Sequence, residues 1–149
     1  AGEAKVIMEN YFTRFGGVKR YLDEVVQQAK ETGYTETLYG RRRYLPELNS
    51  SNRVARENAE RAALNAPIQG TAADIIKLAM LRVDRAIREQ NLKSRVLLQV
   101  HDELVVEVAK GELDKVSELV QREMDAAARL RVPLEISAGH GKNWDEAAH

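Results

Sequence analysis

Two adjacent carboxylates, Asp102 and Glu103, stand between two short apolar runs at 96–100 and 104–108. Carboxylates are hard oxygen ligands, which suit Mg²⁺ better than a softer metal. Because so short an interval between two such runs predicts an antiparallel hairpin, both acids should project from its turn. Aspartate is also a common turn residue for local hydrogen-bonding reasons, so the pair alone favours a plain turn over a metal site.

Polar side chains precede these acids on the first apolar run. Strand alternation places Gln99 and His101 on the face opposite Leu98 and Val100, which indicates a surface that touches a ligand. His101 could be a general base, a metal ligand or a contact residue, although a lone histidine on a strand is more often structural. No serine or cysteine is arranged beside it as a nucleophile, and the sequence has no P-loop or dinucleotide glycine pattern.

A second set of polar residues suits nucleic acid. Arg61 and Asn65 are four residues apart and therefore share a helix face, and Gln69 follows just beyond Pro67. Arginine, asparagine and glutamine side chains fit phosphate and base-edge contacts. A solvated helix face followed by a turn glutamine explains the same residues about equally well.

Three consecutive arginines, Arg41, Arg42 and Arg43, follow a predicted tight turn. Such a row is normally solvated, but three guanidinium forks on a hairpin can also grip phosphate. The 149 residues carry 23 basic and 23 acidic side chains, so the whole-chain charge favours no partner. The basic excess is local, because residues 14–61 hold ten basic and seven acidic side chains.

The composition excludes several classes of protein. It is 44% hydrophobic and 31% charged, which is typical of a globular domain, and no apolar run approaches the roughly 18 residues of a membrane span. The absence of cysteine excludes disulfides, thiolate nucleophiles and cysteine-based zinc sites. The chain begins with Ala1 and shows no signal peptide, and we expect it to be a piece of a longer protein.

Hydrophobic spacing predicts the elements that position the first set of basic residues. We expect a helix up to a break at Gly16 and Gly17, a second helix up to Gly33, and a hairpin over 34–45. Residues 46–52 form a polar connection and the best candidate for a domain boundary. A basic helix should then run from about 53 to 65.

A proline should end that helix, because the Pro67 ring clashes with the carbonyl four residues earlier. Thr71 and Asp74 resemble a capping box that starts the next helix. Its apolar stripe is formed by Ile76, Met80, Val83 and Ile87.

The remaining pattern predicts the 96–108 hairpin, an amphipathic helix and a final strand over 133–138, with Trp144 anchoring the tail on the core. The order helix, strand, strand, helix, strand matches an α+β, ferredoxin-like unit that lacks its first strand. A strand from upstream in the parent chain should therefore fill the gap beside the hairpin turn.

Several strings in the sequence closely resemble one family. They are LQVHDELV at 98–105, RAALNAPIQGTAAD at 61–74, TLYGRRRYLP at 37–46 and the Asn143-Trp144 tail. Together they resemble the C-terminal part of the bacterial DNA polymerase I family, the family A DNA polymerases. The match covers essentially the whole chain.

The resemblance implies template-directed addition of deoxynucleotides to a primer 3′ end, with two Mg²⁺ ions in the complete enzyme. Its partners would be primer–template DNA and deoxynucleoside triphosphates. Asp102 would be one of two essential metal-binding carboxylates, and Glu103 a neighbouring acid of lesser role. The predicted DNA-binding residues are Arg61, Asn65, Gln69, Gln99, His101, Arg41, Arg42 and Arg43.

The same resemblance assigns residues 1–52 to the end of the fingers and 53–149 to a palm without its first strand. The family's other metal aspartate, in a DYS-type strand, and its nucleotide-binding helix have no counterpart in this sequence. We expect a cytoplasmic, nucleoid-associated bacterial enzyme of DNA replication and repair, with no membrane association. The oligomeric state is not predicted.

Two other classes stay open. One is a stand-alone nucleic-acid-binding module with a ferredoxin-like fold and no catalysis, whose sheet should carry stacking aromatics, yet residues 96–108 contain none. The other is a metal-binding or interaction domain that uses the hairpin structurally. Salt-dependent binding to primer–template DNA, weakened by Arg61→Ala, would favour the polymerase fragment or the nucleic-acid-binding module over this metal-binding or interaction domain.

We predict that the isolated chain shows no measurable primer extension, because one metal-binding aspartate cannot organise a two-metal site. The measurement is a primer-extension assay with labelled primer–template and Mg²⁺. Extension that disappears in Asp102→Ala would contradict the prediction.

Overall fold

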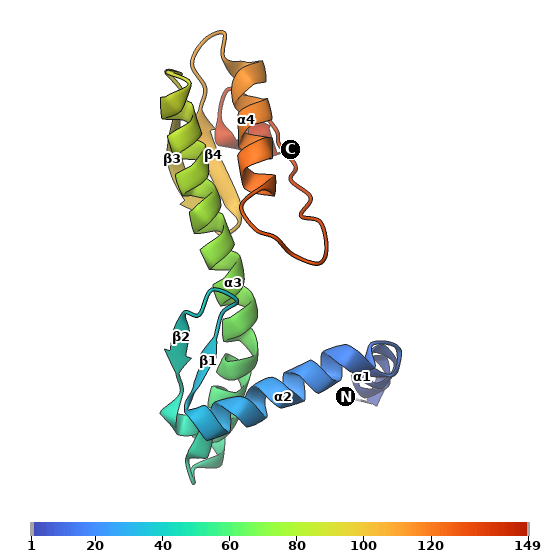
Figure 1. The fold of residues 1–149 in the computed structure, drawn as a ribbon. Helices are drawn as coiled ribbons and strands as arrows, with labels where there is room; N and C mark the ends of the chain where they lie inside the picture. The colour runs from blue at the N-terminus through green and yellow to red at the C-terminus, as the bar shows by residue number, and fades with distance from the viewer. Residues whose placement is uncertain (1, 149) are drawn as a thin grey trace. The chain divides into compact units, whose positions relative to one another are not determined.

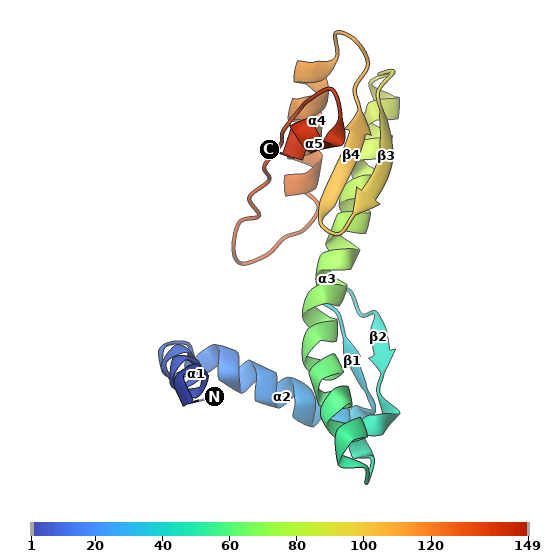
Figure 2. The same ribbon diagram turned by 180° about the vertical axis from the view of Figure 1, so that it is seen from behind.

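The computed structural model describes residues 2–148. It divides into two compact units, Ala1–Thr71 and Ala72–His149, so the division falls inside the longest helix, α3 (Arg53–Glu89). Figures 1 and 2 show the chain from opposite sides, with the β1–β2 hairpin beside the first part of α3 and the β3–β4 hairpin beside its last part. None of the helices in the described part is long and apolar enough to cross a bilayer.

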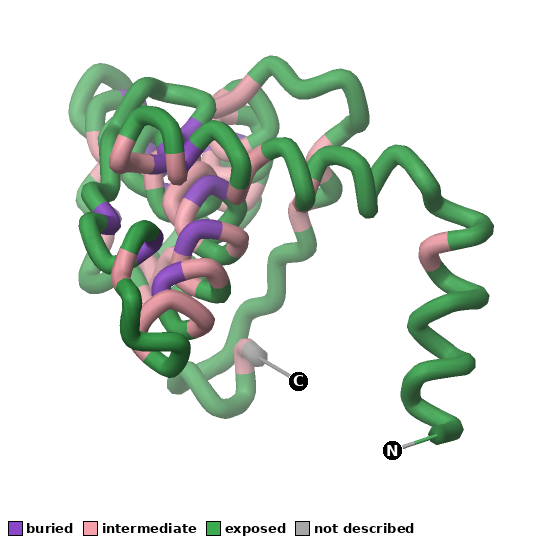
Figure 3. The backbone as a smooth tube through the Cα atoms, turned by 90° about the horizontal axis from the view of Figure 1, so that it is seen from below, coloured by how far each residue is buried: buried purple, intermediate pink, exposed green. Residues whose placement is uncertain are grey.

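Two helices begin the first unit, as predicted. α1 (Gly2–Arg14) and α2 (Gly16–Thr32) are separated at Phe15, and the two glycines start α2 instead of forming a longer break. None of the described α1 residues is buried (Figure 3). α2 ends at Gly33, whose φ of +84° is a left-handed conformation that glycine adopts easily, and the Gly33 N–H donates to the Ala29 carbonyl at 2.8 Å.

The predicted first hairpin is confirmed. β1 (Tyr34–Glu36) pairs antiparallel with β2 (Arg42–Tyr44), and Glu36 lies opposite Arg42. Thr37 organises the tip between them, because its hydroxyl accepts the N–H groups of Tyr39 and Arg41, each at 3.2 Å. The tip is therefore held by hydrogen bonds of its own.

The connection after this hairpin is packed instead of merely polar. It contains the 3₁₀-helix η1 (Pro46–Asn49), whose Leu48 is only 1% exposed. The first core consists of Ala29, Leu45, Leu48, Ala59 and Ala63. Small alanine side chains let α2, η1 and α3 approach closely, and this packing stabilises the first unit.

α3 begins where the sequence predicts but does not end there. The Asn52 side-chain oxygen accepts the N–H groups of Val54 and Ala55 at 2.9 and 3.2 Å, which is an N-cap. The helix then continues through Pro67 to Glu89, so the predicted stop at Pro67 is wrong. Pro67 is buried, and the helix around it is rich in alanine, which has the highest helix propensity. Tertiary packing on both sides of the proline overrides its local preference.

The predicted capping box is also wrong, because Thr71 lies inside α3. Its hydroxyl accepts the backbone N–H of Leu38 at 3.0 Å, a contact from the hairpin tip 33 residues away in sequence. A threonine side chain that could cap a helix end instead serves a tertiary contact here. The apolar stripe that follows is confirmed, since Ile76, Val83 and Ile87 are buried.

The second unit is built on a second antiparallel hairpin. β3 (Arg95–Val100) pairs with β4 (Glu103–Glu107), with an irregularity between Val96 and Leu98. α4 (Leu113–Asp125) follows and buries Val116 and Leu119. The second core consists of Val83, Ala86, Ile87 and Leu119, with Val96, Leu104 and Val106 among the side chains packed against it. The α+β class is therefore confirmed, with helices and two small antiparallel sheets.

Two predictions for the C-terminal part are wrong. Residues 133–138 form no strand: Pro133 lacks an N–H donor, and none of the described strands pairs with this segment. Trp144 does not anchor the tail, because it is 46% exposed at the start of α5 (Trp144–Ala148). The tail is ordered instead by Asn143 and Glu146, since the Glu146 N–H donates to Asn143 Oδ1 at 3.0 Å and Asn143 Nδ2 donates to Glu146 Oε1 at 3.1 Å.

One carboxylate joins the connection before β3 to the connection before α4. Glu112 accepts the backbone N–H groups of Lys93 and Ser94, each at 3.0 Å, and the Ser94 hydroxyl at 2.6 Å. The hydrogen bond from Lys93 is the main reason that the pKa of Glu112 is lowered, followed by the one from the Ser94 side chain. The folded state therefore favours the charged carboxylate.

We predict that Glu112→Gln destabilises the second unit near neutral pH and that the difference from the original chain shrinks in acid. A carboxylate with a lowered folded-state pKa stabilises the fold above its ordinary pKa of about 4.5, and this contribution is lost as the pH falls through the lower folded value. Urea unfolding midpoints measured from pH 7 to pH 3 test this. Glu118→Gln, on the exposed surface of α4, is the control, and equal pH profiles for the two variants would refute the prediction.

Candidate nucleic-acid interface and carboxylate turn

The two-residue turn between β3 and β4 is formed by His101 and Asp102. Val100 lies opposite Glu103 across this turn, and His101 has a φ of +51°. Gln99 Nε2 donates to the His101 carbonyl at 2.6 Å, which ties the end of β3 to the turn. All four polar residues, Gln99, His101, Asp102 and Glu103, are exposed. The hairpin prediction is confirmed, with Asp102 exposed in the turn and Glu103 exposed as the first residue of β4.

The strand register shows which face Gln99 occupies. Gln99 lies opposite Leu104, which packs against the second core, whereas Leu98 lies opposite Val105 on the other face. Gln99 and Leu98 therefore lie on opposite faces, as predicted, but His101 lies in the turn and does not extend the face of Gln99. The irregularity beside Leu98 means that Val96 and Gln99 share the core-side face, and Leu98 stays 43% exposed on the other.

The chemistry of the turn fits a magnesium site in part. Asp102 and Glu103 are neighbouring, exposed oxygen donors of the type that Mg²⁺ prefers. However, within residues 2–148 no group of three or more His, Asp or Glu side chains lies close enough to hold a metal ion. The turn therefore offers part of a donor set, and further ligands would have to come from outside these residues.

The second candidate surface lies on α3. Arg61, Asn65 and Gln69 are exposed, and on an unbroken helix they fall within about 80° of one another over about 12 Å of axis. The Arg61 guanidinium donates to the Asn58 side-chain oxygen on the same surface. Because α3 does not end at Pro67, Gln69 continues the face that Arg61 and Asn65 begin.

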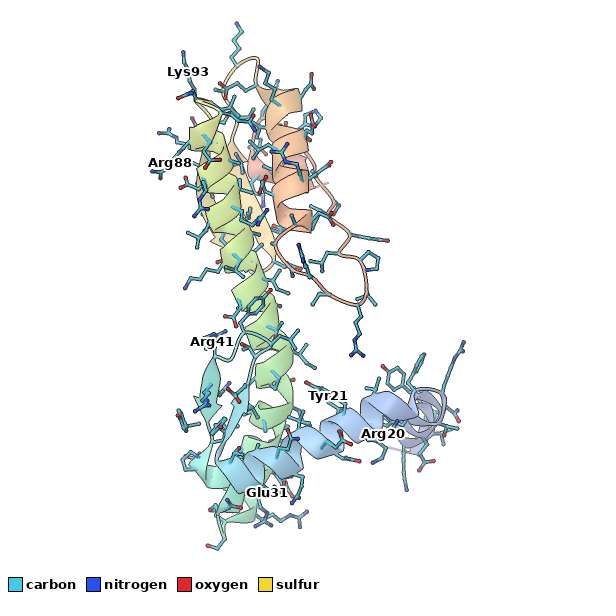
Figure 4. All side chains as sticks on the ribbon, in the orientation of Figure 1. Arg20, Tyr21, Glu31, Arg41, Arg88 and Lys93 are labelled. Atoms are coloured by element: carbon cyan, nitrogen blue, oxygen red, sulfur yellow. The ribbon has the colours of Figure 1, made fainter. Side chains whose placement is uncertain are left out.

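The three arginines of the first hairpin have different surroundings. Arg41 Nη2 donates to the Gly70 carbonyl at 3.0 Å, and Figure 4 labels its side chain at the hairpin tip beside α3. Arg42 Nε donates to Glu36 Oε2 at 3.1 Å, and its guanidinium lies 4.4 Å from the centre of the Tyr34 ring. The hydrogen bond to Glu36 is the main cause of the raised pKa of Arg42.

Arg43 differs from both neighbours. Among the residues that the structure describes, none forms a hydrogen bond, ion pair or ring contact with the Arg43 side chain. Of the three arginines predicted to bind phosphate, Arg43 therefore has a guanidinium without a contact among the described residues. Arg41 and Arg42 also stabilise the hairpin. The candidate residues form two groups, one in each compact unit.

Sequence reasoning missed Gly70 and Thr71 as contact residues of the hairpin tip. A side-chain Cβ at Gly70 would lie 2.7 Å from Thr37 Cγ2, so only glycine permits this approach. A glycine inside a helical pattern is a known sign of close approach by another backbone. That signal was present in the sequence, but the predicted break at Pro67 concealed it.

Comparison with known proteins identifies the family. The model of DNA polymerase family A matches residues 1–146. The chain belongs to this family. The resemblance seen in the VHDE turn and in the α3 motif of this family A chain is thereby confirmed.

Family A relatives are similar over nearly the whole chain. DNA polymerase I of Mycobacterium leprae is 61% identical over 147 residues, which are 99% of this chain and 16% of that protein. DNA polymerase I of Pseudomonas aeruginosa is 52% identical over 145 residues, 97% of this chain and 16% of that protein. The chain thus spans about a sixth of the length of these curated relatives.

A solved family A structure is also similar. It is the POL domain of Pol1 from M. smegmatis in complex with DNA primer-template and dNTP, with 64% sequence identity and a TM-score of 0.96. The similarity covers 99% of this chain and 26% of that one.

Proposed function

We propose that this chain is part of a DNA-directed DNA polymerase that adds deoxynucleotides to a primer 3′ end as a template directs. The observation that carries the proposal is an exposed Asp102 in a two-residue turn, within a family A chain of which 99% is similar to a POL domain solved with primer-template and dNTP. The partners would be primer–template DNA and deoxynucleoside triphosphates. The reaction would be nucleotidyl transfer in the complete protein.

The exposed face of α3 would hold the duplex. Arg61, Asn65 and Gln69 present hydrogen-bond donors over about 12 Å of helix axis, which equals the rise of roughly three to four base pairs. Minor-groove acceptors are nearly the same for every base pair, so such donors reward pair geometry and not sequence. Sequence-independent binding is what a copying enzyme needs.

Other candidate residues would add contacts to the backbone and the primer end. Arg43 is exposed and suited to a phosphate, with Arg41 and Arg42 beside it in sequence. His101 and Gln99 flank the carboxylate turn and would contact the nucleic acid near the reacting end. With these assignments, the candidate residues of the first unit and those at the β3–β4 turn would bind the same substrate, primer–template DNA.

The carboxylate turn would hold magnesium together with acids from outside this chain. Asp102 would be the metal-binding ligand, and Glu103 an accessory acid. When bound, two Mg²⁺ ions would activate the primer 3′ hydroxyl and stabilise the pyrophosphate leaving group. The contribution of this chain is to present Asp102 from a turn fixed by the β3–β4 pairing and by the Gln99 hydrogen bond.

The remaining assignments follow from the family. Residues 1–52 would be the end of the fingers and residues 53–149 the palm, completed by a strand from upstream. The parent protein would act in DNA replication and repair, in the cytoplasm at the nucleoid. The exposed apolar side chain of Leu98 on the β3–β4 hairpin is consistent with a missing neighbour there.

We predict that Arg61→Ala in the full-length protein weakens binding to primer–template DNA about tenfold, because a charged hydrogen-bond donor is lost. The loss should be similar for duplexes of different sequence. Fluorescence anisotropy with labelled primer–template measures the dissociation constant. Arg88→Ala, an exposed arginine at the other end of α3, is the matched control and should bind as the original protein does.

A substitution at Asp102 in the full-length protein tests the role of the carboxylate turn in catalysis separately from DNA binding. Asp102→Asn should abolish primer extension while primer–template binding without metal is retained, because the substitution removes a metal-binding charge and leaves the α3 face unchanged. Asp114→Asn, at an exposed position on α4, should extend primers normally. Normal extension by Asp102→Asn would disprove the proposed role of the turn.

A further inference from the structure

The tip of the first hairpin is fastened to the turn of α3 that follows Pro67. The Leu38 N–H donates to Thr71 Oγ1 at 3.0 Å, and Arg41 Nη2 donates to the Gly70 carbonyl at 3.0 Å. Both contacts join residues about 30 positions apart, and both lie within the first compact unit. They meet α3 at two successive residues, immediately after Gln69.

The hairpin tip lies close to the α3 backbone, and hydrogen bonds within the tip fix its conformation. At Gly70 a Cβ would meet Thr37 Cγ2 at 2.7 Å and Arg41 Nη2 at 3.4 Å, so the tip rests directly on the helix backbone. Thr37 is itself buried and holds the tip through the bonds that its hydroxyl accepts. The tip is therefore held both by hydrogen bonds of its own and by hydrogen bonds to α3.

This support lies where α3 needs it. Proline has no N–H, so the Ala63 carbonyl loses its intrahelical partner, and a proline in a helix interior is destabilising. Ala63 and Pro67 are buried, which holds the helix before this point. The hairpin tip supplies two hydrogen bonds within one turn after it.

The support also leaves the proposed DNA-binding face free. At about 100° per residue, Gly70 lies about 140° and Thr71 about 120° around the helix from Asn65, the middle of the face shared with Arg61 and Gln69. Those three side chains are exposed. The hairpin therefore contacts the helix at the residues next to Gln69, away from the middle of the proposed DNA-binding face.

We propose that Thr71 is a positioning residue for primer–template binding. Its hydroxyl, together with the Arg41 contact to Gly70, holds the turn after Pro67 so that Gln69 keeps its register with Arg61 and Asn65. This inference rests on the proposed function of the α3 face. Thr71 itself does not touch the substrate and acts through Gln69.

The test uses Thr71→Val in the full-length polymerase, because valine keeps the shape of threonine and removes the hydroxyl. The KM for primer–template should rise about fivefold, the effect of one lost hydrogen bond, while kcat at saturating primer–template changes less than twofold. Thr71→Ser, which keeps the hydroxyl, should restore the original KM. Thr13→Val is the matched control, since the Thr13 hydroxyl donates to the carbonyl of Glu9 in its own helix.

A double-mutant cycle with Gln69→Ala shows whether Thr71 acts through Gln69. Thr71→Val should have no further effect on KM in the Gln69→Ala protein. An equal, independent rise in KM in that background would overturn the inference, as would an unchanged KM in Thr71→Val alone. If Thr71→Val does not fold, Gly70→Ala replaces it in the same cycle, because its added methyl displaces the tip and favours the helix.

The two proposals fail in different ways. If Gln69→Ala and Arg61→Ala both leave primer–template binding unchanged, the proposed function of the α3 face is wrong, and the inference about Thr71 falls with it. If those variants weaken binding and Thr71→Val does not, only the inference about Thr71 is wrong.

Discussion

The continuity of α3 through Pro67 is the constraint on which the rest of the structure depends. Each compact unit builds its core on its own part of this helix, on Ala59 and Ala63 in the first and on Val83 and Ile87 in the second. An interior proline opposes such a helix by about 3 kcal/mol or more. Burial of apolar side chains before the proline and the hairpin contacts after it offset that cost.

This constraint also organises the two candidate surfaces. The polar face of α3 is continuous only if the helix is, because a break at Pro67 would separate Gln69 from Arg61 and Asn65. The carboxylate turn depends on the second core, since β3 and β4 are held there by Val96, Leu104 and Val106. This family A chain thus presents the proposed DNA-binding donors and the proposed metal-binding acid from two separately packed cores.

Much of the fold could be predicted from the sequence where the local signals agree. The two hairpins, the end of α2 at Gly33 and the stripe of Ile76, Val83 and Ile87 were predictable, because turn residues and hydrophobic period give the same answer. Pro67 and Thr71 were misread, since tertiary contacts overrode a local breaker and a local cap. The 133–138 segment alternates like a strand, but pairing needs a neighbour that sequence alternation cannot supply. Asp102 and Glu103 were predictable as acids at a hairpin turn, but the described residues bring no third acid or histidine to them, so the proposed metal site would need ligands from elsewhere.

A structure of the full-length protein bound to primer–template DNA, determined by cryo-electron microscopy, tests the central claim most directly. We predict that α3 is one helix from Arg53 to Glu89 in that complex and that Arg61, Asn65 and Gln69 reach minor-groove acceptors from one face. We further predict that the hydrogen bond from Leu38 to Thr71 is kept. A helix broken at Pro67, or a duplex bound away from these three side chains, would contradict this account of how the chain holds DNA.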